Sequence, residues 1–284
     1  MPHNDKNIVL AGIDGSALTK SVCDYAAWVA KATGAPLRLL HNLEQRHNAA
    51  VSDLSGSIGL GSQGELLEEL TRVEQERTRL LLEKGKLMLA AAHDHANAAG
   101  VDDVESWQRH GSLQASLVDL EAQIRVLVLG VHGEDHAQGQ LGSHLESVIR
   151  ALHRPVLVVN HEFSGPKNIL LAYDGTDAAN KALEMVAASP LFKSLFCHLV
   201  MVGSADKRAV LESAAAKLHA VGIAHKTALL DGRPEEVLCE YQQQNSIDLT
   251  VMGAFSHHRI RDMLFGSFTA KMLQKADHPL LLLR

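Results

Sequence analysis

The sequence repeats itself, and this repeat restricts the possible fold more than any other feature. Residues 7–16 read NIVLAGIDGS and residues 168–177 read NILLAYDGTD, so an apolar run ends both times in Asp-Gly and a hydroxyl residue. Residues 142–160 (GSHLESVIRALHRPVLVVN) and 266–284 (GSFTAKMLQKADHPLLLLR) match in the same way. Ordered segments that occur twice predict two copies of one structural unit.

Each copy alternates strand-like and helical patterns. In the first copy Leu18, Val22, Tyr25 and Val29 recur at helical spacing, with Ser16 placed as the N-cap and Gly34 as the stop. The second copy has the same face at Ala179, Leu183 and Val186, and Pro190 ends it. Strands that alternate with helices predict an α/β fold with parallel strands and right-handed crossovers. We expect a first domain at residues 1–160, a shorter second domain at residues 167–284, and a linker at 161–166.

The first copy is longer mainly because of residues 44–99. We expect a polar loop at 44–64 and a long charged helix at about 65–99. One stripe of this helix collects mostly apolar residues, namely Leu66, Leu70, Val73, Arg77, Leu80 and Leu81. The charged run from Glu65 to Lys86 predicts Glu–Arg and Glu–Lys pairs on a solvated helix rather than a binding surface.

Composition excludes several classes of function. Hydrophobic residues make up 46% of the chain and aromatic residues 4%, which is typical of Leu, Val, Ile and Ala cores in parallel sheets. The net charge of −6 gives no reason to expect nucleic acid as a partner. No apolar run is long enough to span a membrane, and the polar N-terminus indicates no signal peptide. Three widely spaced cysteines form no disulfide framework, so we expect a cytoplasmic protein.

A ligand site is expected where the strand order reverses, beyond the carboxyl ends of the strands. Asp14 and Asp174 follow the first strand of each copy, where a carboxylate can accept hydrogen bonds from ribose hydroxyls. A glycine-bearing loop after the fourth strand leads to a Gly-Ser pair at a helix start, Gly142-Ser143 in the first copy and Gly266-Ser267 in the second. Backbone N–H groups at such a helix start favour phosphate.

The spacing of these residues resembles the universal stress protein family. The first copy reads Gly130-x-x-Gly133, eight residues, Gly142-Ser143, and the second reads Gly253-x-x-Ser256, nine residues, Gly266-Ser267. Nucleotide-binding members of that family carry G-x-x-G, nine residues, then G-S or G-T. The resemblance covers essentially the whole chain, twice.

The resemblance implies a fold and a ligand. The fold is two tandem, doubly wound, parallel five-stranded sheets of the adenine-nucleotide alpha-hydrolase type, packed as a pseudo-dimer. We expect contact through the last strands, 155–160 and 279–283, because such apolar edges need a cover. The implied ligand is ATP, with Mg²⁺. Asp14 and Asp174 would face ribose, the glycines and serines would face phosphates, and Val202 would lie against adenine, where the first copy has Asn42.

Both copies depart from the family pattern. The first is one residue short and its loop contains Glu134 and Asp135, which would repel phosphate. The second has Ser256 in place of a glycine, but its loop contains the cationic or titratable residues His257, His258, Arg259 and Arg261. We therefore expect the second half to be the one that binds ATP.

Other functions stay open beside nucleotide binding. One alternative is an interaction or scaffold protein of the same fold without a nucleotide, and another is a slow ATPase. No catalytic motif is present, so we predict a binding protein without catalytic residues. The histidines form no ligand set, and Gly59-Leu60-Gly61-Ser62-Gln63-Gly64 follows no convincing strand, so we expect neither a metal site nor a dinucleotide site there. A homodimer is left open.

Overall fold

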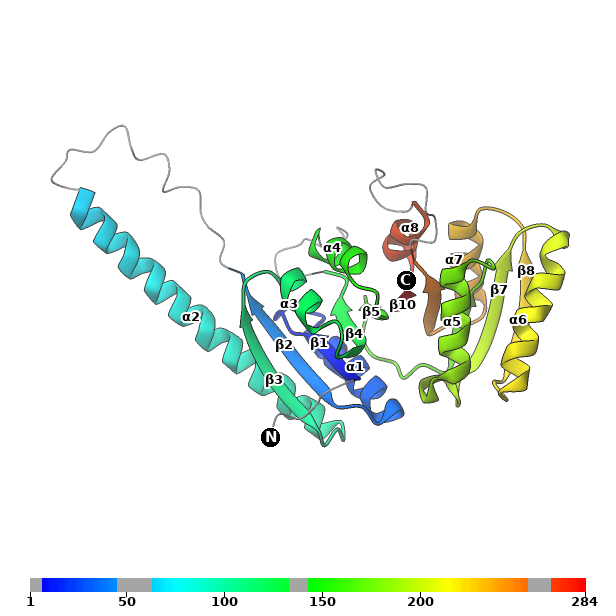
Figure 1. The fold of residues 1–284 in the computed structure, drawn as a ribbon, viewed down its shortest axis with the longest axis horizontal. Coiled ribbons are helices and arrows are strands. Elements are labelled where there is room, and N and C mark those ends of the chain that lie inside the picture. Colours follow the sequence, from blue (N-terminus) through cyan, green and yellow to red (C-terminus); the bar gives the residue numbers. More distant parts are fainter. Residues whose placement is uncertain (1–6, 45–62, 133–142, 255–266) are drawn as a thin grey trace.

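All the described strands form one ten-stranded sheet (Figure 1). The computed structural model describes residues 7–44, 63–132, 143–254 and 267–284. The strand order is β3-β2-β1-β4-β5-β10-β9-β6-β7-β8. Counted within each half, both copies therefore have the order 3-2-1-4-5, as the internal repeat predicts.

Strands and helices alternate along the first half. They are β1 (Ile8–Gly12), α1 (Thr19–Thr33), β2 (Leu37–Leu43), α2 (Gln63–Ala98), β3 (Val104–His110), α3 (Leu113–Leu120), β4 (Ile124–Gly130), α4 (Ser143–Ala151) and β5 (Val156–Val159). All four strand pairs of this half are parallel.

The second half follows the same plan with a shorter second helix. Its elements are β6 (Asn168–Ala172), α5 (Asp177–Ala188), β7 (Phe196–Val202), α6 (Arg208–Ala220), β8 (His225–Leu230), α7 (Pro234–Gln244), β9 (Leu249–Gly253), α8 (Ser267–Lys275) and β10 (Leu280–Leu283). Its strand pairs are parallel too, which confirms the predicted α/β class.

The two halves join edge to edge through their last strands. β5 and β10 are antiparallel, and Leu157 lies opposite Leu281. Both strands are buried along their whole length. The predicted pseudo-dimer is therefore confirmed, and the pairing covers the two apolar edges that would otherwise favour aggregation.

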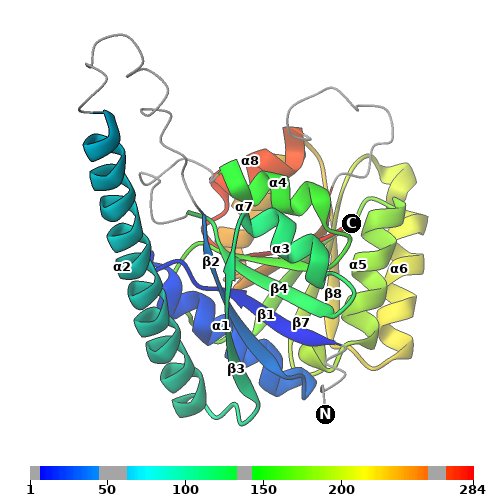
Figure 2. The same cartoon turned by 60° about the vertical axis from the view of Figure 1, so that its left-hand side comes forward.

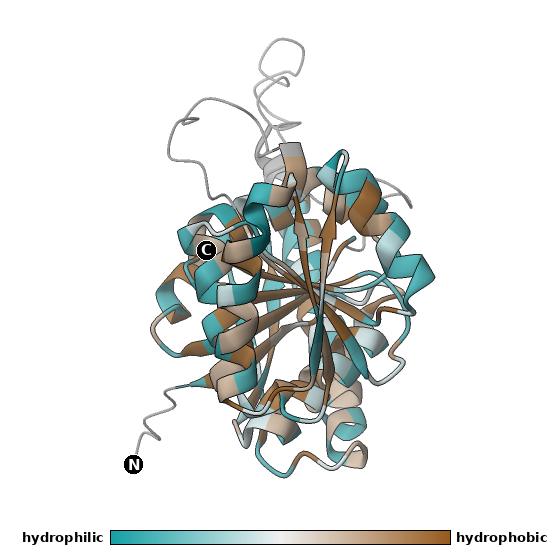
Figure 3. Cartoon of the chain, turned by 90° about the vertical axis from the view of Figure 1, so that its right-hand side faces the viewer, coloured by the Kyte–Doolittle hydropathy of each residue, from teal (hydrophilic) through white to brown (hydrophobic). Residues whose placement is uncertain are grey.

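Two layers of helices cover the sheet, as Figure 2 and Figure 3 show. Side chains from α1, α2, α5 and α6 pack in one apolar cluster, and side chains from α3, α4, α7 and α8 pack in the other. Neighbouring residues such as Val9 and Leu10 enter opposite clusters because successive strand side chains point to opposite faces. No helix of the described residues is long and apolar enough to cross a membrane.

The starts of the first helices correct one expectation. Ser16 does not cap α1, which begins at Thr19 with Leu18 in the N-cap position. Ser16 instead donates its backbone N–H to the side chain of Asp14, so it belongs to the turn after β1 and not to the start of α1. Thr176 does cap α5, through the N–H of Ala179. Gly34 ends α1 as predicted, with a φ of 64°.

Candidate functional site

The strand order reverses once in each half, and both reversals bring two predicted site residues side by side. β1 pairs with β2 on one side and β4 on the other, and β6 pairs in the same way with β7 and β9. Asp14 and Gly130 therefore lie at one switch point, and Asp174 and Gly253 lie at the other. Open parallel sheets bind ligands at such points.

Asp14 forms a tight turn with the residues that follow it. Its Oδ1 accepts hydrogen bonds from the backbone N–H of Ser16 (2.9 Å) and the hydroxyl of Thr19 (3.1 Å). Gly15 has a φ of 79°, a conformation that L side chains rarely adopt. The side chain of Asp14 is half-buried.

Asp174 repeats this turn in a more open setting. Its Oδ1 accepts hydrogen bonds from the backbone N–H (2.9 Å) and the hydroxyl (2.6 Å) of Thr176. Gly175 has a φ of 82°, and Asp174 is exposed. Among described residues both hydrogen bonds go to Oδ1, so Oδ2 can accept a hydrogen bond from a ligand hydroxyl.

The two turns differ in what packs over them. A Cβ on Gly15 would lie 2.5 Å from Sδ of Met88, which belongs to the long helix α2. A Cβ on Gly175 would lie 3.4 Å from Cγ1 of Val210, on α6. Helix α2, part of the insertion that lengthens the first half, therefore packs more closely over the turn at Gly15 than α6 packs over the turn at Gly175.

The two glycines at the ends of β4 and β9 differ in how closely other atoms pack against them. A Cβ on Gly253 would lie 2.7 Å from the backbone carbon of Ala178 and 2.8 Å from the N of Ala179, so only glycine lets α5 pack there. A Cβ on Gly130 would meet the carbonyl oxygen of His132 at 3.3 Å and Leu18 at 3.5 Å. Packing by itself therefore explains Gly253.

Two matching residues at the carboxyl ends of β2 and β7 also differ in chemistry, Asn42 next to the last residue of β2 and Val202 at the end of β7. Asn42 donates from Nδ2 to Oγ of Ser116 (2.7 Å) and to the carbonyl oxygen of Gly111 (3.2 Å), so this amide holds the start of α3. Val202 is half-buried and packs against the apolar cluster under α7 and α8. Only the second half has an apolar surface at this place.

Beyond Gly130 and Gly253, the residues predicted to face phosphate are described only at the starts of α4 and α8. Ser143 is the first residue of α4 and Ser267 is the first residue of α8, as the Gly-Ser motif predicts for a helix start. Gly133, Gly142, Ser256 and Gly266 lie outside the described residues, as do the charged residues expected between them.

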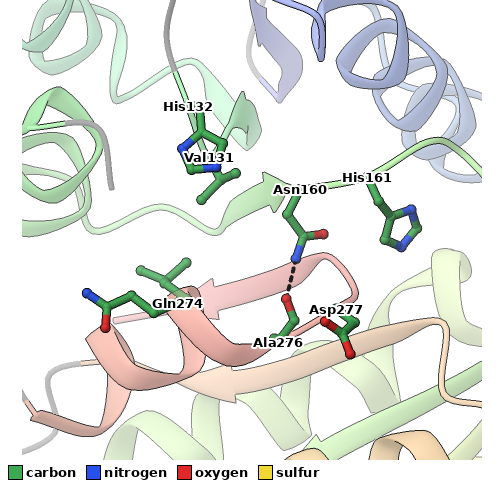
Figure 4. A pocket seen from close by; sticks show the side chains of 8 residues that line it. Val131, His132, Asn160, His161, Gln274, Ala276 and Asp277 are labelled. Carbon is green, nitrogen blue, oxygen red and sulfur yellow. Dashed lines mark hydrogen bonds between the residues drawn. The ribbon is translucent and has the colours of Figure 1, made fainter. Parts of the chain in front are cut away.

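A pocket of about 320 Å³, which the sequence patterns do not indicate, lies between the halves (Figure 4). It is lined by Val131, His132, Asn160, His161, Leu273, Gln274, Ala276 and Asp277. Asn160 closes one side by donating to the carbonyl oxygens of Ala276 (2.7 Å) and His278 (3.0 Å). Because β5 and β10 are antiparallel, the end of β5 meets the start of β10. This contact joins the two halves, so the sequence patterns within each half do not predict it.

Burial shifts the pKa of two cysteines, Cys23 on α1 and Cys197 on β7, and of His278 near the pocket. Burial raises the pKa of the Cys23 and Cys197 thiols to about 12, so both stay protonated near neutral pH. Burial, with the nearby His161, lowers the pKa of His278. Within the described ranges, no three His, Cys, Asp or Glu residues are grouped so that they could hold a metal ion.

A family profile and a full-length relative show the family of this chain, and solved structures share its fold. The profile of the Universal stress protein family matches residues 6–160 and 198–284. Universal stress protein Slr1230 of Synechocystis sp. is 38% identical over 98% of this chain and all of its own length. The crystal structure of a universal stress protein from Archaeoglobus fulgidus superposes over 98% of both chains, with a TM-score of 0.74 and 19% identity. A functionally unknown protein from Pseudomonas aeruginosa matches 98% of this chain with a TM-score of 0.63 and 15% identity.

Proposed function

Because the chain belongs to the universal stress protein family, we propose that it binds an adenine nucleotide, ATP, in its second half and works as a stress or signalling module. The two halves would be separate domains, residues 1–160 and 167–284. The three free cysteines suit a reducing compartment, so we assign the protein to the cytoplasm.

The observation that carries this proposal is the difference between the two switch points. In the second half Asp174 is exposed and Val202 offers an apolar surface at the end of the neighbouring strand. In the first half Gly15, next to the matching Asp14, lies under Met88, and Asn42 is hydrogen-bonded to Ser116 of α3. Charge favours the same half, because residues 257–261 include two arginines, whereas Glu134 and Asp135 follow β4.

The residues of the second half fit the three parts of an adenine nucleotide. Oδ2 of Asp174 would accept a hydrogen bond from a ribose hydroxyl, and Val202 would contact the base. The free N–H groups at the start of α8 would bind phosphate, aided by the positive end of the helix dipole. A bound Mg²⁺ would neutralise phosphate charge.

The main alternative is an interaction or scaffold protein that keeps the fold without the nucleotide. One contact keeps this alternative open. Since Gly253 is needed for α5 to pack on β9, this glycine of the family motif would be retained even without a ligand.

Mass spectrometry of the gently purified full chain separates the two functions. We expect a co-purified adenine nucleotide in the unmodified protein and in Asp14→Ala, and its loss in Asp174→Ala. A protein that carries no nucleotide, and takes none up from added ATP, would support the scaffold function instead.

A further inference from the structure

Helix α2 is only partly packed against the rest of the molecule. Figure 1 shows its N-terminal part projecting beyond the edge of the sheet. Its inner face is buried at Gly85, Leu89, Ala92 and Ala96. A Cβ on Gly85 would overlap the side-chain amide of Gln108, so glycine allows the helix to lie close to β3 at this place. The helix is therefore fixed at its C-terminal part and free to contact another molecule along the rest.

A regular apolar stripe runs along the outer side of this helix. Val73, Leu80 and Leu87 follow one another at intervals of seven residues, and their exposed fractions are 53%, 58% and 72%. Seven residues are close to two helical turns, so the three side chains lie on one side of the helix. Exposed apolar residues at this spacing are typical of helices that pair with another helix.

The charges on α2 are separated along its length. The first part of the helix is acidic, with Glu65, Glu68, Glu69, Glu74 and Glu76 against a single Arg72. The following part is basic, with Arg77, Arg79, Lys84 and Lys86 against a single Glu83. Such a helix is complementary to itself only when the second copy runs in the opposite direction.

One antiparallel register satisfies the apolar stripe and the charges together. In an antiparallel pair, Val73 of each copy can lie opposite Leu80 of the other. The same register lays the acidic part of each helix, residues 65–76, alongside the basic part of the other, residues 77–86. A parallel pair would instead place acidic residues against acidic residues.

Pairs within the helix do not remove this complementarity. The expected Glu–Arg and Glu–Lys pairs are present, for example Glu76 with Arg79 at 2.8 Å and Glu83 with Lys86 at 3.2 Å. They are exposed, so each stabilises the helix only weakly. These ion pairs do not cover Val73, Leu80 and Leu87, which stay exposed.

We propose that the outer face of α2, residues 69–87, is a homodimer interface in which the helices of two chains pair antiparallel. Because the last strands are already paired within one chain, this contact is distinct from the edge-to-edge sheet contact. A single helix pair buries little surface, so the dimer should be concentration-dependent.

Sedimentation of the full chain over a wide concentration range tests the interface. We expect a monomer–dimer equilibrium, and a rise of at least about tenfold in its Kd in the double variant Val73→Glu/Leu80→Glu. The matched control is Val118→Glu, which charges a similarly exposed valine (48%) on α3 and should leave the Kd unchanged. A strictly monomeric chain, or a double variant with the Kd of the unmodified protein, would overturn the proposal.

Disulfide cross-linking tests the direction of the pair. In a Cys239→Ser background, an oxidised mixture of Val73→Cys and Leu80→Cys chains should give mixed disulfide dimers. Either variant alone should give few, because positions seven apart lie about 10 Å apart along a helix, beyond the reach of a disulfide. Efficient cross-linking of Val73→Cys with itself would instead indicate a parallel pair and contradict the register.

Charge exchange gives an independent check that does not depend on new cysteines. Arg77→Glu/Arg79→Glu makes the paired part of α2 acidic, and Glu74→Arg/Glu76→Arg makes it basic, so each variant alone should dimerise more weakly. An equimolar mixture of the two variants should associate again, because the acidic helix then pairs with the basic one. Circular dichroism shows whether α2 stays helical in both variants. A mixture that associates no more tightly than either variant alone, with the helices intact, would rule out this pairing.

Discussion

Leu281 of β10 lies directly opposite Leu157 of β5 in the antiparallel pair that joins the two halves. Each has only 1% of its surface exposed, and both belong to the apolar cluster under α1, α2, α5 and α6. The two halves therefore share a continuous core across the junction, and stability should be coupled between them.

Leu157→Ala and Leu281→Ala should each lower the free energy of unfolding by about 2–5 kcal/mol, because each leaves a cavity in a packed core. As the two side chains are cross-strand neighbours, the double variant should lose measurably less or more than the sum. Denaturant unfolding of the two single variants and the double variant measures this coupling. The control pairs Leu281→Ala with Leu39→Ala on the distant β2, whose effects should add to within about 0.5 kcal/mol. Strict additivity of the first pair would contradict the shared core.

The repeat in the sequence predicted this fold in unusual detail, because both copies carry the same apolar runs in the same order. The junction was predictable since 155–160 and 279–283 are too apolar to remain free edges. The start of α1 was not, because Ser16 has the side chain of an N-cap but gives its N–H to Asp14. The projection of α2 was also unpredictable, since its helical pattern does not tell a packed face from a free one.

Gly253→Ala should destabilise the second half by about 1–3 kcal/mol with or without a nucleotide, because the new methyl group meets the backbone of Ala178 and Ala179. Gly130→Ala is the matched change in the first half and should cost less, since its nearest contacts are longer. Thermal unfolding of both variants, with and without ATP, measures the difference. A larger loss in Gly130→Ala would contradict the packing described for α5.

His198 should make the protein less stable at mildly acidic pH. Burial and the nearby Lys226 lower its pKa to about 4 from an ordinary value of 6.5. The unfolded chain therefore takes up a proton on falling below pH 6.5, whereas the folded chain does so only near pH 4. The stability present above pH 6.5 should be lost progressively across that window, to the order of 3 kcal/mol.

His198→Phe isolates this effect. The variant also removes a buried Nδ1 that has no hydrogen-bond partner among the described residues. Between pH 6.5 and 4 its free energy of unfolding should fall less steeply than that of the unmodified protein. Equal slopes in the two proteins would show that His198 is not the residue that titrates.

The protein should hydrolyse ATP slowly or not at all. In the proposed site Asp174 would bind ribose, at the opposite end of the nucleotide from the γ-phosphate, so it would not act as the base for an attacking water. Backbone donors hold substrate and product phosphates about equally, which favours binding without acceleration. A steady-state assay with Mg²⁺ measures this. Turnover on the order of 1 s⁻¹ that disappears in Asp174→Ala would identify an enzyme instead.

The candidate site was predictable only in part. Asp14 and Asp174 stand at the switch points as expected because both follow the first strand of a repeated unit. The sequence did not reveal that Gly253 is held by the backbone of α5, or that Met88 lies over Gly15, since both contacts join residues far apart in the chain. The pocket beside Asn160 was missed for a related reason, because it forms only where β5 meets the start of β10.

Titration calorimetry with ATP tests the central claim most directly, through the matched variants Asp174→Ala and Asp14→Ala. The account predicts that Asp174→Ala weakens or abolishes binding, whereas Asp14→Ala binds like the unmodified protein. Gly266→Val and Gly142→Val should repeat this difference at the phosphate end. Equal losses in the two halves, or losses confined to Asp14→Ala and Gly142→Val, would contradict the assignment of the nucleotide to the second half.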